Sequence, residues 1–151
     1  MFQESGLETI ELSEGLETID HMAFYKCKLK SIVLPQTVKQ ISVQAFLSCT
    51  ELESITLNEG LETIEYLAFY NTPKLKNITI PSTVKSVTEY AFGHDIEQIK
   101  FAGNAPETFI YSDDIQGETR HIINDYCTIY YHEDAKGFTS PTWYGYQTAI
   151  W

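Results

Sequence analysis

The sequence predicts a single solenoid of stacked repeats, of the α/β type but rich in short strands and poor in helix, with an aromatic C-terminal cap. Three observations support this fold class. The dipeptide Ala-Phe recurs at positions 23–24, 45–46, 68–69 and 91–92, and a segment of alternating apolar residues accompanies each copy. Ten of the fifty residues from Ala102 onward are aromatic. A fixed period of about 20–50 residues indicates a repeat architecture.

Each unit opens with a segment that we expect to form a strand. The segments are LETIELS (7–13), LKSIVLP (29–35), LESITLN (52–58), LKNITIP (75–81) and IEQIKFA (96–102). Their apolar residues alternate with polar ones, which is typical of a strand with one buried face. Pro35 and Pro81 directly follow their strands, where a missing N–H does not interrupt a ladder.

A second apolar step follows in each unit, and the unit ends at the Ala-Phe dipeptide. The second steps are Leu16/Ile19, Val38/Ile41, Leu61/Ile64 and Val84/Val87. One unit cannot enclose its own apolar face, whereas stacking on a neighbour buries it. The small alanine beside each phenylalanine predicts a tight corner where the coil turns. We therefore expect four repeats plus a partial one over residues 7–101, and a degenerate last repeat with the cap over residues 102–151.

Charge alternates between successive units. The near-copies LSEGLETIDHMAF (12–24) and LNEGLETIEYLAF (57–69) stand two units apart. The position after the first leucine reads Glu8, Lys30, Glu53, Lys76, Glu97, and the position after the second step reads Glu17, Lys39, Glu62, Lys85. Stacking places equivalent positions about 4.7–4.9 Å apart, so ladders of opposite charge are predicted. Recognition of a partner by this charge pattern is the alternative interpretation.

The composition argues against several classes of partner. The formal net charge is −11, whereas nucleic-acid backbones and anionic membrane surfaces attract clustered lysine and arginine. No apolar run approaches the roughly 20 residues that span a bilayer. The first residues, MFQESGLETIEL, show no basic region followed by an apolar one, so they are not expected to be a signal peptide.

The titratable residues show no catalytic or metal-binding pattern, so we expect no enzyme activity, no cofactor and no metal. The histidines His21, His94, His121 and His132 lack metal-site spacing. Asp113 and Asp114 lack the ordered oxygen ligands of a calcium loop and are interpreted as a solvated acidic turn.

The cysteines are interpreted as core or corner thiols. Cys27 and Cys49 occupy a repeat position that Thr72 and Asp95 fill later, and with Cys127 they form no C-x-x-C pair. A disulfide between the stacked Cys27 and Cys49 is conceivable, although free thiols are the more common outcome.

The unit AFLSCTELESITLNEGLETIEYLAF (45–69) resembles the BspA-type leucine-rich repeat of bacterial surface proteins, with its C-x-x-L-x-x-I-x-L-P…V-x-x-I…A-F pattern. The resemblance covers about residues 7–101, and one unit departs by a residue between Cys27 and Leu29. It implies a right-handed leucine-rich-repeat superhelix and an extracellular or bacterial cell-surface location. It also implies a non-enzymatic role in adhesion or in binding a host or other cell-surface protein. A spacer that displays another domain of a longer protein is the alternative.

The C-terminal third departs from the repeat. Residues 107–126 are interpreted as an irregular insertion, the TIYY segment (128–131) as one more strand, and the remainder as an aromatic tail. The tail resembles the W-x-G-Y segment that closes BspA-type modules. Capping the open end of a solenoid is favoured over ligand binding for Trp143 and Tyr146. For Trp151 the two roles are about equally favoured, and a sugar ring is one conceivable ligand.

The outward strand positions form the predicted interaction surface. Between the buried residues these positions read Ser31, Val33, Ser54, Thr56, Asn77, Thr79, Gln98 and Lys100. The candidate partner-binding residues are Ser54, Thr56, Asn77, Thr79, Trp143, Tyr144 and Trp151. A merely solvated sheet face is the alternative for any one of the strand residues.

The first repeat is expected to expose an apolar edge. Only MFQESG precedes Leu7, so no residues are available there to form a cap like the aromatic one. We expect the chain to be a piece of a longer repeat protein, or a further unit or a partner to cover this edge.

Overall fold

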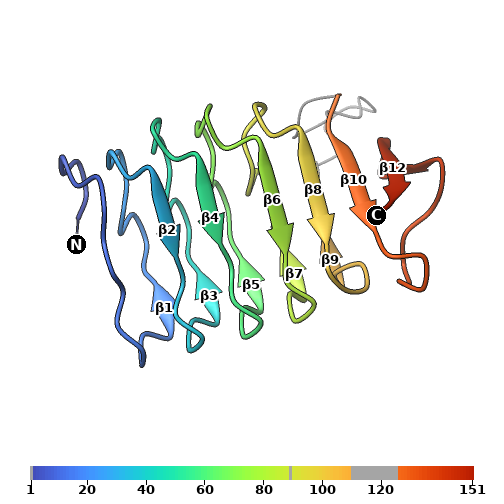
Figure 1. The fold of residues 1–151 in the computed structure, drawn as a ribbon, viewed down its shortest axis with the longest axis horizontal. Helices are drawn as coiled ribbons and strands as arrows, with labels where there is room; N and C mark the ends of the chain where they lie inside the picture. The colour runs from blue at the N-terminus through green and yellow to red at the C-terminus, as the bar shows by residue number, and fades with distance from the viewer. Residues whose placement is uncertain (1, 89, 110–125) are drawn as a thin grey trace.

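The computed structural model describes residues 2–88, 90–109 and 126–151. These residues coil into a solenoid whose turns stack along one axis (Figure 1). We count a turn from one corner phenylalanine to the residue before the next, which gives turns over residues 2–23, 24–45, 46–68 and 69–91, and a fifth turn that begins at residue 92. The described residues form twelve strands and no helix, so none of them belongs to a helix able to cross a bilayer. The predicted solenoid is confirmed.

One column of longer strands runs along the stack. It consists of β2 (Ser31–Val33), β4 (Ser54–Thr56), β6 (Asn77–Ile80), β8 (Gln98–Phe101), β10 (Thr128–Tyr131) and β12 (Tyr146–Ile150). The strands lie side by side in chain order (Figure 1). β2 pairs with β4, and β6, β8, β10 and β12 are joined by parallel pairing. Residues 7–13, expected as a strand, form none. They lie at the outer edge of the stack, where a neighbouring turn is present on one side only.

A second column of two-residue strands arises from the second apolar step. It consists of β1 (Thr18–Ile19), β3 (Gln40–Ile41), β5 (Thr63–Ile64), β7 (Ser86–Val87) and β9 (Thr108–Phe109), paired in parallel in that order. The prediction that residues 107–126 are irregular was wrong for β9. Phe109 pairs with Val87 and takes the column's buried position, which continues the sheet by one turn. Asp113, Asp114 and His121 lie outside the described residues.

The Ala-Phe dipeptides form the corners, as expected. Ala45 and Ala68 are fully buried, and the phenylalanine rings of successive corners stack nearly parallel. Their centroids lie 5.1 Å apart for Phe24 and Phe46, and 5.2 Å apart for Phe46 and Phe69. Phe2 adds a ring 5.6 Å from Phe24. No alanine precedes Phe2, so the Ala-Phe dipeptide does not mark this earlier corner.

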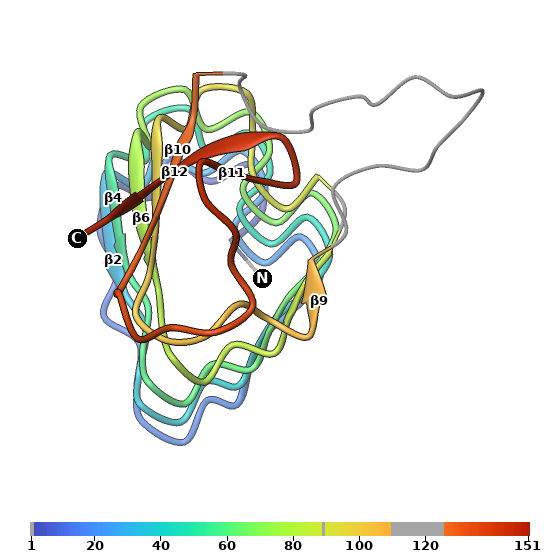
Figure 2. The same cartoon turned by 90° about the vertical axis from the view of Figure 1, so that its right-hand side faces the viewer.

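The cap contains more structure than the sequence indicates. TIYY forms β10 as predicted, and the aromatic tail, for which no strand was predicted, adds two. β12 pairs in parallel with β10, and β11 (Thr142–Trp143) pairs antiparallel with β12. Trp143 and Tyr146 are buried, and Trp143 contacts the rings of Phe101, Phe109 and Phe138. Figure 2 shows this segment lying across the end of the coil.

The predicted charge ladders are present as pairs between adjacent turns. Lysine nitrogen to glutamate oxygen distances are 2.9 Å for Lys30–Glu8, 3.6 Å for Lys39–Glu17, 3.5 Å for Lys76–Glu97 and 2.8 Å for Lys85–Glu62. All side chains in these pairs are more than two-fifths exposed, so each pair contributes little by itself. The alternation mainly removes the repulsion that like charges would cause in register.

The cysteines lie in the core with free thiols, as expected. The Sγ of Cys49 donates to the carbonyl oxygen of Phe24, 2.9 Å away, and the Sγ of Cys27 donates to that of Phe2, 2.7 Å away. Each of these two thiols therefore bonds to the backbone of the preceding corner.

Candidate interaction surface

The outer face of the long-strand column carries the side chains that the sequence singled out. Ser54 and Thr56 on β4, and Asn77 and Thr79 on β6, are exposed, whereas Ile78 between the latter two is buried. We call these four side chains the strip. Strand alternation explains their position, because each buried residue turns both of its neighbours outward.

The strip lines one concavity of about 620 Å³. The same concavity is bordered by Gln98 and Lys100 of β8, by Glu59 and by Pro81. Sequence reasoning placed Gln98 and Lys100 outward but left them out of the candidate set. The register of β6 and β8 pairs Asn77 with Gln98 and Thr79 with Lys100, so these residues extend the strip by one strand.

Aromatic rings gather around Lys100 at the C-terminal end of this face. The Lys100 ammonium lies 5.0 Å from the centre of the Trp151 ring and 5.9 Å from that of Tyr130. The ring of His132 stacks on Trp151 at 4.7 Å. Such cation–π contacts are stabilising. Within the described part of the chain Lys100 forms no ion pair, so it presents a positive charge beside an aromatic platform.

The sequence did not reveal this cluster as a unit. The alternation of residues in TIYY predicts that Tyr130 faces outward. Its position opposite Lys100 in the sheet depends on how the chain returns from residue 102 to β10. The terminal Trp151 reaches the same place because β12 adds beside β10, and its backbone N–H donates to the carbonyl of Tyr131. Neither pairing follows the repeat period, so the period gave no signal for them.

The other aromatic candidates lie elsewhere. Trp143 is 6% exposed inside the cap, where it packs on Phe109 with ring centres 4.6 Å apart. Tyr144 is 44% exposed, and its ring stacks on Phe109 of the second column at 5.8 Å. The structure therefore brings Trp151 to the same outer face as the strip, but not Trp143 or Tyr144.

The chemical capacity of this face is hydrogen bonding and stacking. It offers hydroxyl and amide groups on the strip, one ammonium group and the rings beside it. The thiols lie in the interior, where burial raises the pKa of Cys49 and of Cys127 to about 12, so both are protonated at neutral pH. Among the described residues no three histidine, cysteine, aspartate or glutamate side chains gather as metal ligands.

Comparison with known proteins identifies related sequences and folds. Residues 1–100 match the family described as BspA type leucine rich repeat region, in six copies. A leucine-rich repeat protein from Bacteroides capillosus is 28% identical with a TM-score of 0.56, over 58% of this chain and 64% of its own. No curated protein matches the sequence.

Two further solved structures share the fold. A leucine rich cell surface protein from Faecalibacterium prausnitzii is 24% identical, with a TM-score of 0.57 over 64% of this chain and 26% of its own. The pneumococcal vaccine antigen PcpA is 20% identical, with a TM-score of 0.67 over 85% of this chain and 37% of its own. The present chain thus spans less than two thirds of each of these three proteins.

Proposed function

Since the chain belongs to the BspA-type leucine-rich repeat family, we propose that it is a non-enzymatic protein-interaction module of a bacterial cell-surface or secreted protein. Repeats over residues 7–101 supply the binding face, and residues 102–151 close the stack and place Trp151 beside that face. The partner is a host protein or another cell-surface protein, and the outcome is adhesion.

The observation that carries this proposal is the concavity of about 620 Å³ on the long-strand column. Solenoids use extended faces of this kind to bind other proteins. Short hydroxyl and amide side chains lose little rotamer entropy on binding and offer both donors and acceptors. At the end of the same face Lys100 and Trp151 provide a charge and a half-exposed ring, and aromatic residues are enriched at protein interfaces.

The names of related proteins support the proposed location. One structural relative is described as a cell surface protein and another as a vaccine antigen, which is consistent with exposure to other cells. A spacer that displays another domain is the competing function, and a spacer needs no binding face.

Carbohydrate binding is a second candidate for one part of the surface. The ring of Trp151 is 43% exposed and Tyr130 lies close to the same ammonium group, so the pair offers a stacking platform for a sugar. The strip itself has no exposed ring and is assigned to protein recognition.

The test compares two matched variants in binding assays against extracellular-matrix and cell-surface proteins. The first changes the strip, Ser54, Thr56, Asn77 and Thr79, to alanine. The control changes four polar strand residues of the second column, Thr18, Gln40, Thr63 and Ser86, to alanine. We expect saturable binding by the wild type and the control but not by the strip variant.

Two outcomes would count against protein recognition by the strip. If the strip variant and the control bind a protein partner equally well, the interface lies elsewhere, and the absence of any saturable protein partner favours the spacer. Binding to a glycan that Trp151→Ala abolishes and the strip variant keeps would assign the aromatic platform to carbohydrate.

A further inference from the structure

The long-strand column is interrupted between β4 and β6. Its strands fall into two sheets, one of β2 and β4 and the other of β6, β8, β10 and β12 with the cap strand β11. Within each sheet the neighbouring strands are joined, but among the described residues no backbone hydrogen bond joins residues 53–58 to residues 76–81. We call this interruption the seam, and it separates the third turn from the fourth.

Backbone groups of β4 point into the seam. The N–H of Ser54 and the carbonyl of Thr56 are bonded to the second turn, at 3.4 and 3.0 Å. Consecutive residues of a strand direct their N–H and C=O groups to opposite sides. The backbone groups of Ile55 and Leu57 therefore face β6.

The same alternation identifies the groups on the other side of the seam. The carbonyls of Lys76 and Ile80 accept N–H groups of the fifth turn, at 2.8 and 2.9 Å. The residues between these bonds, Asn77 and Thr79, therefore direct their backbone groups toward β4. Donors and acceptors thus lie on both sides of the seam without a bond across it.

Pro81 is one reason why the ladder is weak at this place. At the next junction the N–H of Ala102 donates to the carbonyl of Ile80 at 2.9 Å. The register of β6 and β8 makes Pro81 the equivalent of Ala102, and proline has no N–H. Contrary to the expectation from the sequence, the missing N–H therefore removes one possible bond of the ladder.

The concavity of about 620 Å³ lies over the seam. Its lining includes Ile55 of β4 and Ile78 of β6, together with the four residues of the strip. Ile55 is only partly buried, whereas the equivalent Ile32, Ile78 and Ile99 are at most 3% exposed. The opening of the core on this face therefore coincides with the missing ladder, and half of the strip lies on each side of it.

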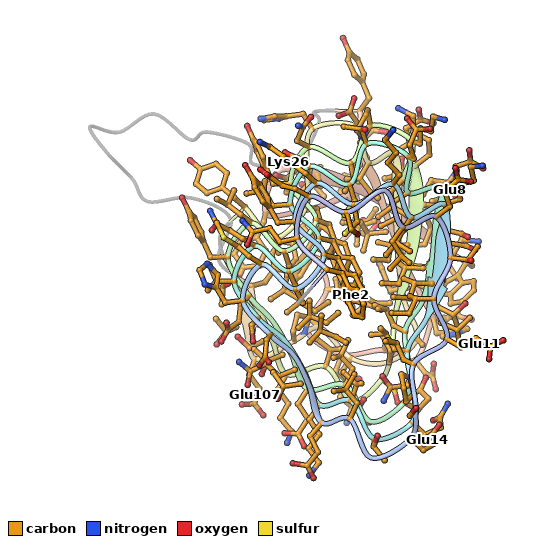
Figure 3. The ribbon with its side chains drawn as sticks, turned by 90° about the vertical axis from the view of Figure 1, so that its left-hand side faces the viewer. Phe2, Glu8, Glu11, Glu14, Lys26 and Glu107 are labelled. Carbon is orange, nitrogen blue, oxygen red and sulfur yellow. The ribbon has the colours of Figure 1, made fainter. Side chains whose placement is uncertain are left out.

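The same two turns are joined on the other side of the core. β5 and β7 pair in parallel, and the rings of Phe46 and Phe69 stack 5.2 Å apart. Figure 2 shows the long-strand column on one side of the coil and β9 of the second column on the other. Figure 3 shows side chains filling the space between, with Glu11 on the long-strand side and Glu107 on the second-column side. The second column is therefore a pivot for a small tilt that widens or narrows the seam.

We propose that the seam is a hinge that gates the strip. In the open state, as in this structure, the concavity is present and the backbone groups of the seam are available to a partner. In the closed state the two turns tilt together about the second column and the concavity is lost. Three hydrogen bonds then cross the seam, from the N–H of Ile55 to the carbonyl of Asn77, from that of Thr79 to Ile55, and from that of Leu57 to Thr79. The gating rests on the proposed function of the strip, whereas the hinge itself does not.

Amide hydrogen exchange followed by NMR tests the seam in the free chain. Its N–H groups, those of Ile55, Leu57 and Thr79, are unbonded in the open state. We expect them to exchange at least about tenfold faster than the N–H groups of Ile78 and Ile99, which lie in joined strands. Equal protection of the two sets would overturn the proposal, because the seam would then be a closed ladder.

A disulfide across the seam tests whether its two sides approach each other. Glu53→Cys with Lys76→Cys places thiols at equivalent positions of the third and fourth turns, outside the strip. Lys30→Cys with Glu53→Cys is the matched control across the joined strands β2 and β4. Paired strands lie about 4.7–4.9 Å apart, within the Cα separation that a disulfide spans. Oxidised glutathione is the oxidant, the three native thiols are buried, and we expect both disulfides to form in the folded chain.

The oxidised and reduced forms are then compared by amide exchange and by binding. The binding probe is an antibody fragment selected on the wild type, whose binding the strip variant abolishes. We expect the seam disulfide to slow the exchange of the three seam amides at least about tenfold and to weaken binding of the fragment at least about tenfold. The control disulfide should change neither.

Two results would overturn the proposal. If the control disulfide forms and the seam disulfide does not, the two sides are fixed apart and there is no hinge. If the seam disulfide forms but leaves either the exchange or the binding unchanged, closing the seam does not gate the strip. None of these measurements requires a natural partner, so the hinge can fail while protein recognition by the strip stands, and the reverse.

Discussion

The Nζ atom of Lys85 lies 2.8 Å from Oε2 of Glu62, one turn earlier in the solenoid. The hydrogen bond between them, followed by their Coulombic attraction, lowers the pKa of the Glu62 carboxyl and raises that of the Lys85 ammonium. Both side chains are substantially exposed, at 46% and 59%. The pair therefore belongs to the surface and joins two consecutive turns through residues 23 positions apart in the sequence.

Reversing one member of this pair should weaken the fold only at low salt. In Lys85→Glu two carboxylates face one another, so the midpoint of thermal unfolding should fall by no more than about 4 °C. The doubly exchanged variant, Glu62→Lys with Lys85→Glu, should recover most of the loss. Melting curves at low and at about 1 M salt check this, because screening removes the difference. An unchanged midpoint at low salt would make the charges incidental.

The pH dependence of the same pair should follow from the two pKa shifts. A lowered carboxyl pKa gives stability that is present above the ordinary value of 4.5 and is lost as pH falls through the folded-state pKa. A raised ammonium pKa gives stability that is present below 10.5 and is lost as pH rises through the folded-state pKa.

The measurement is the free energy of unfolding of the wild type minus that of Glu62→Gln with Lys85→Gln, obtained from urea denaturation across pH. We expect a constant difference between about pH 6 and pH 9 and a smaller one at both extremes. A difference that grows toward acid pH would contradict the assigned pairing.

The stacked phenylalanines should contribute unequally along the column. Phe46 is fully buried between two rings, so Phe46→Ala should lower the free energy of unfolding by about 3–5 kcal/mol. Phe2 is 42% exposed and stacks on one ring, so Phe2→Ala should cost less than about half of that. Chemical denaturation compares the two, and equal losses would contradict the partial exposure of Phe2.

The buried thiols should resist alkylation in the folded protein. Cys49 and Cys127 are fully buried with pKa values of about 12, so few molecules carry the reactive thiolate at pH 8. We expect iodoacetamide to modify both at least about a hundredfold more slowly in the native protein than in urea. Peptide mapping by mass spectrometry assigns each thiol. Similar native and denatured rates would mean that these cysteines are accessible.

The cap should depend on one tryptophan and not on the other. Trp143→Ala removes a ring packed against Phe101, Phe109 and Phe138 and should cost about 3–5 kcal/mol. Trp151→Ala is the control, since that ring is 43% exposed, and it should cost under about 1 kcal/mol. Urea denaturation measures both, and comparable losses would mean that Trp151 is part of the cap.

The repeat period was enough to predict the long strands β2, β4, β6 and β8, the corners and the charge pairs. Each of these depends only on equivalent positions in successive units, such as Lys30 beside Glu8. The second strand column was not predicted, because the L/V-x-x-I/V step also fits other backbone paths. β9 keeps the spacing of the period, since Phe109 pairs with Val87, but the sequence PETF (106–109) does not match the L/V-x-x-I/V step. β12 lies outside the period, so its pairing is decided by tertiary packing around Tyr146 and not by local pattern.

The candidate surface was predicted in part for the same reason. Alternation alone turns Ser54, Thr56, Asn77 and Thr79 outward, and they line one concavity. The neighbourhood of Lys100, Tyr130 and Trp151 joins three strands across a break in the repeat. Sequence spacing does not predict that these three side chains lie close together.

The alternation of acidic and basic turns also restricts how a protein of this kind can change in length. Removing residues 46–68 would set the basic second turn against the fourth, with Lys39 facing Lys85. Removing two consecutive turns would keep opposite charges in contact at every junction. Gain and loss of sequence in this solenoid should therefore be tolerated best in steps of two turns. The unit that can be added or removed is one acidic turn together with one basic turn.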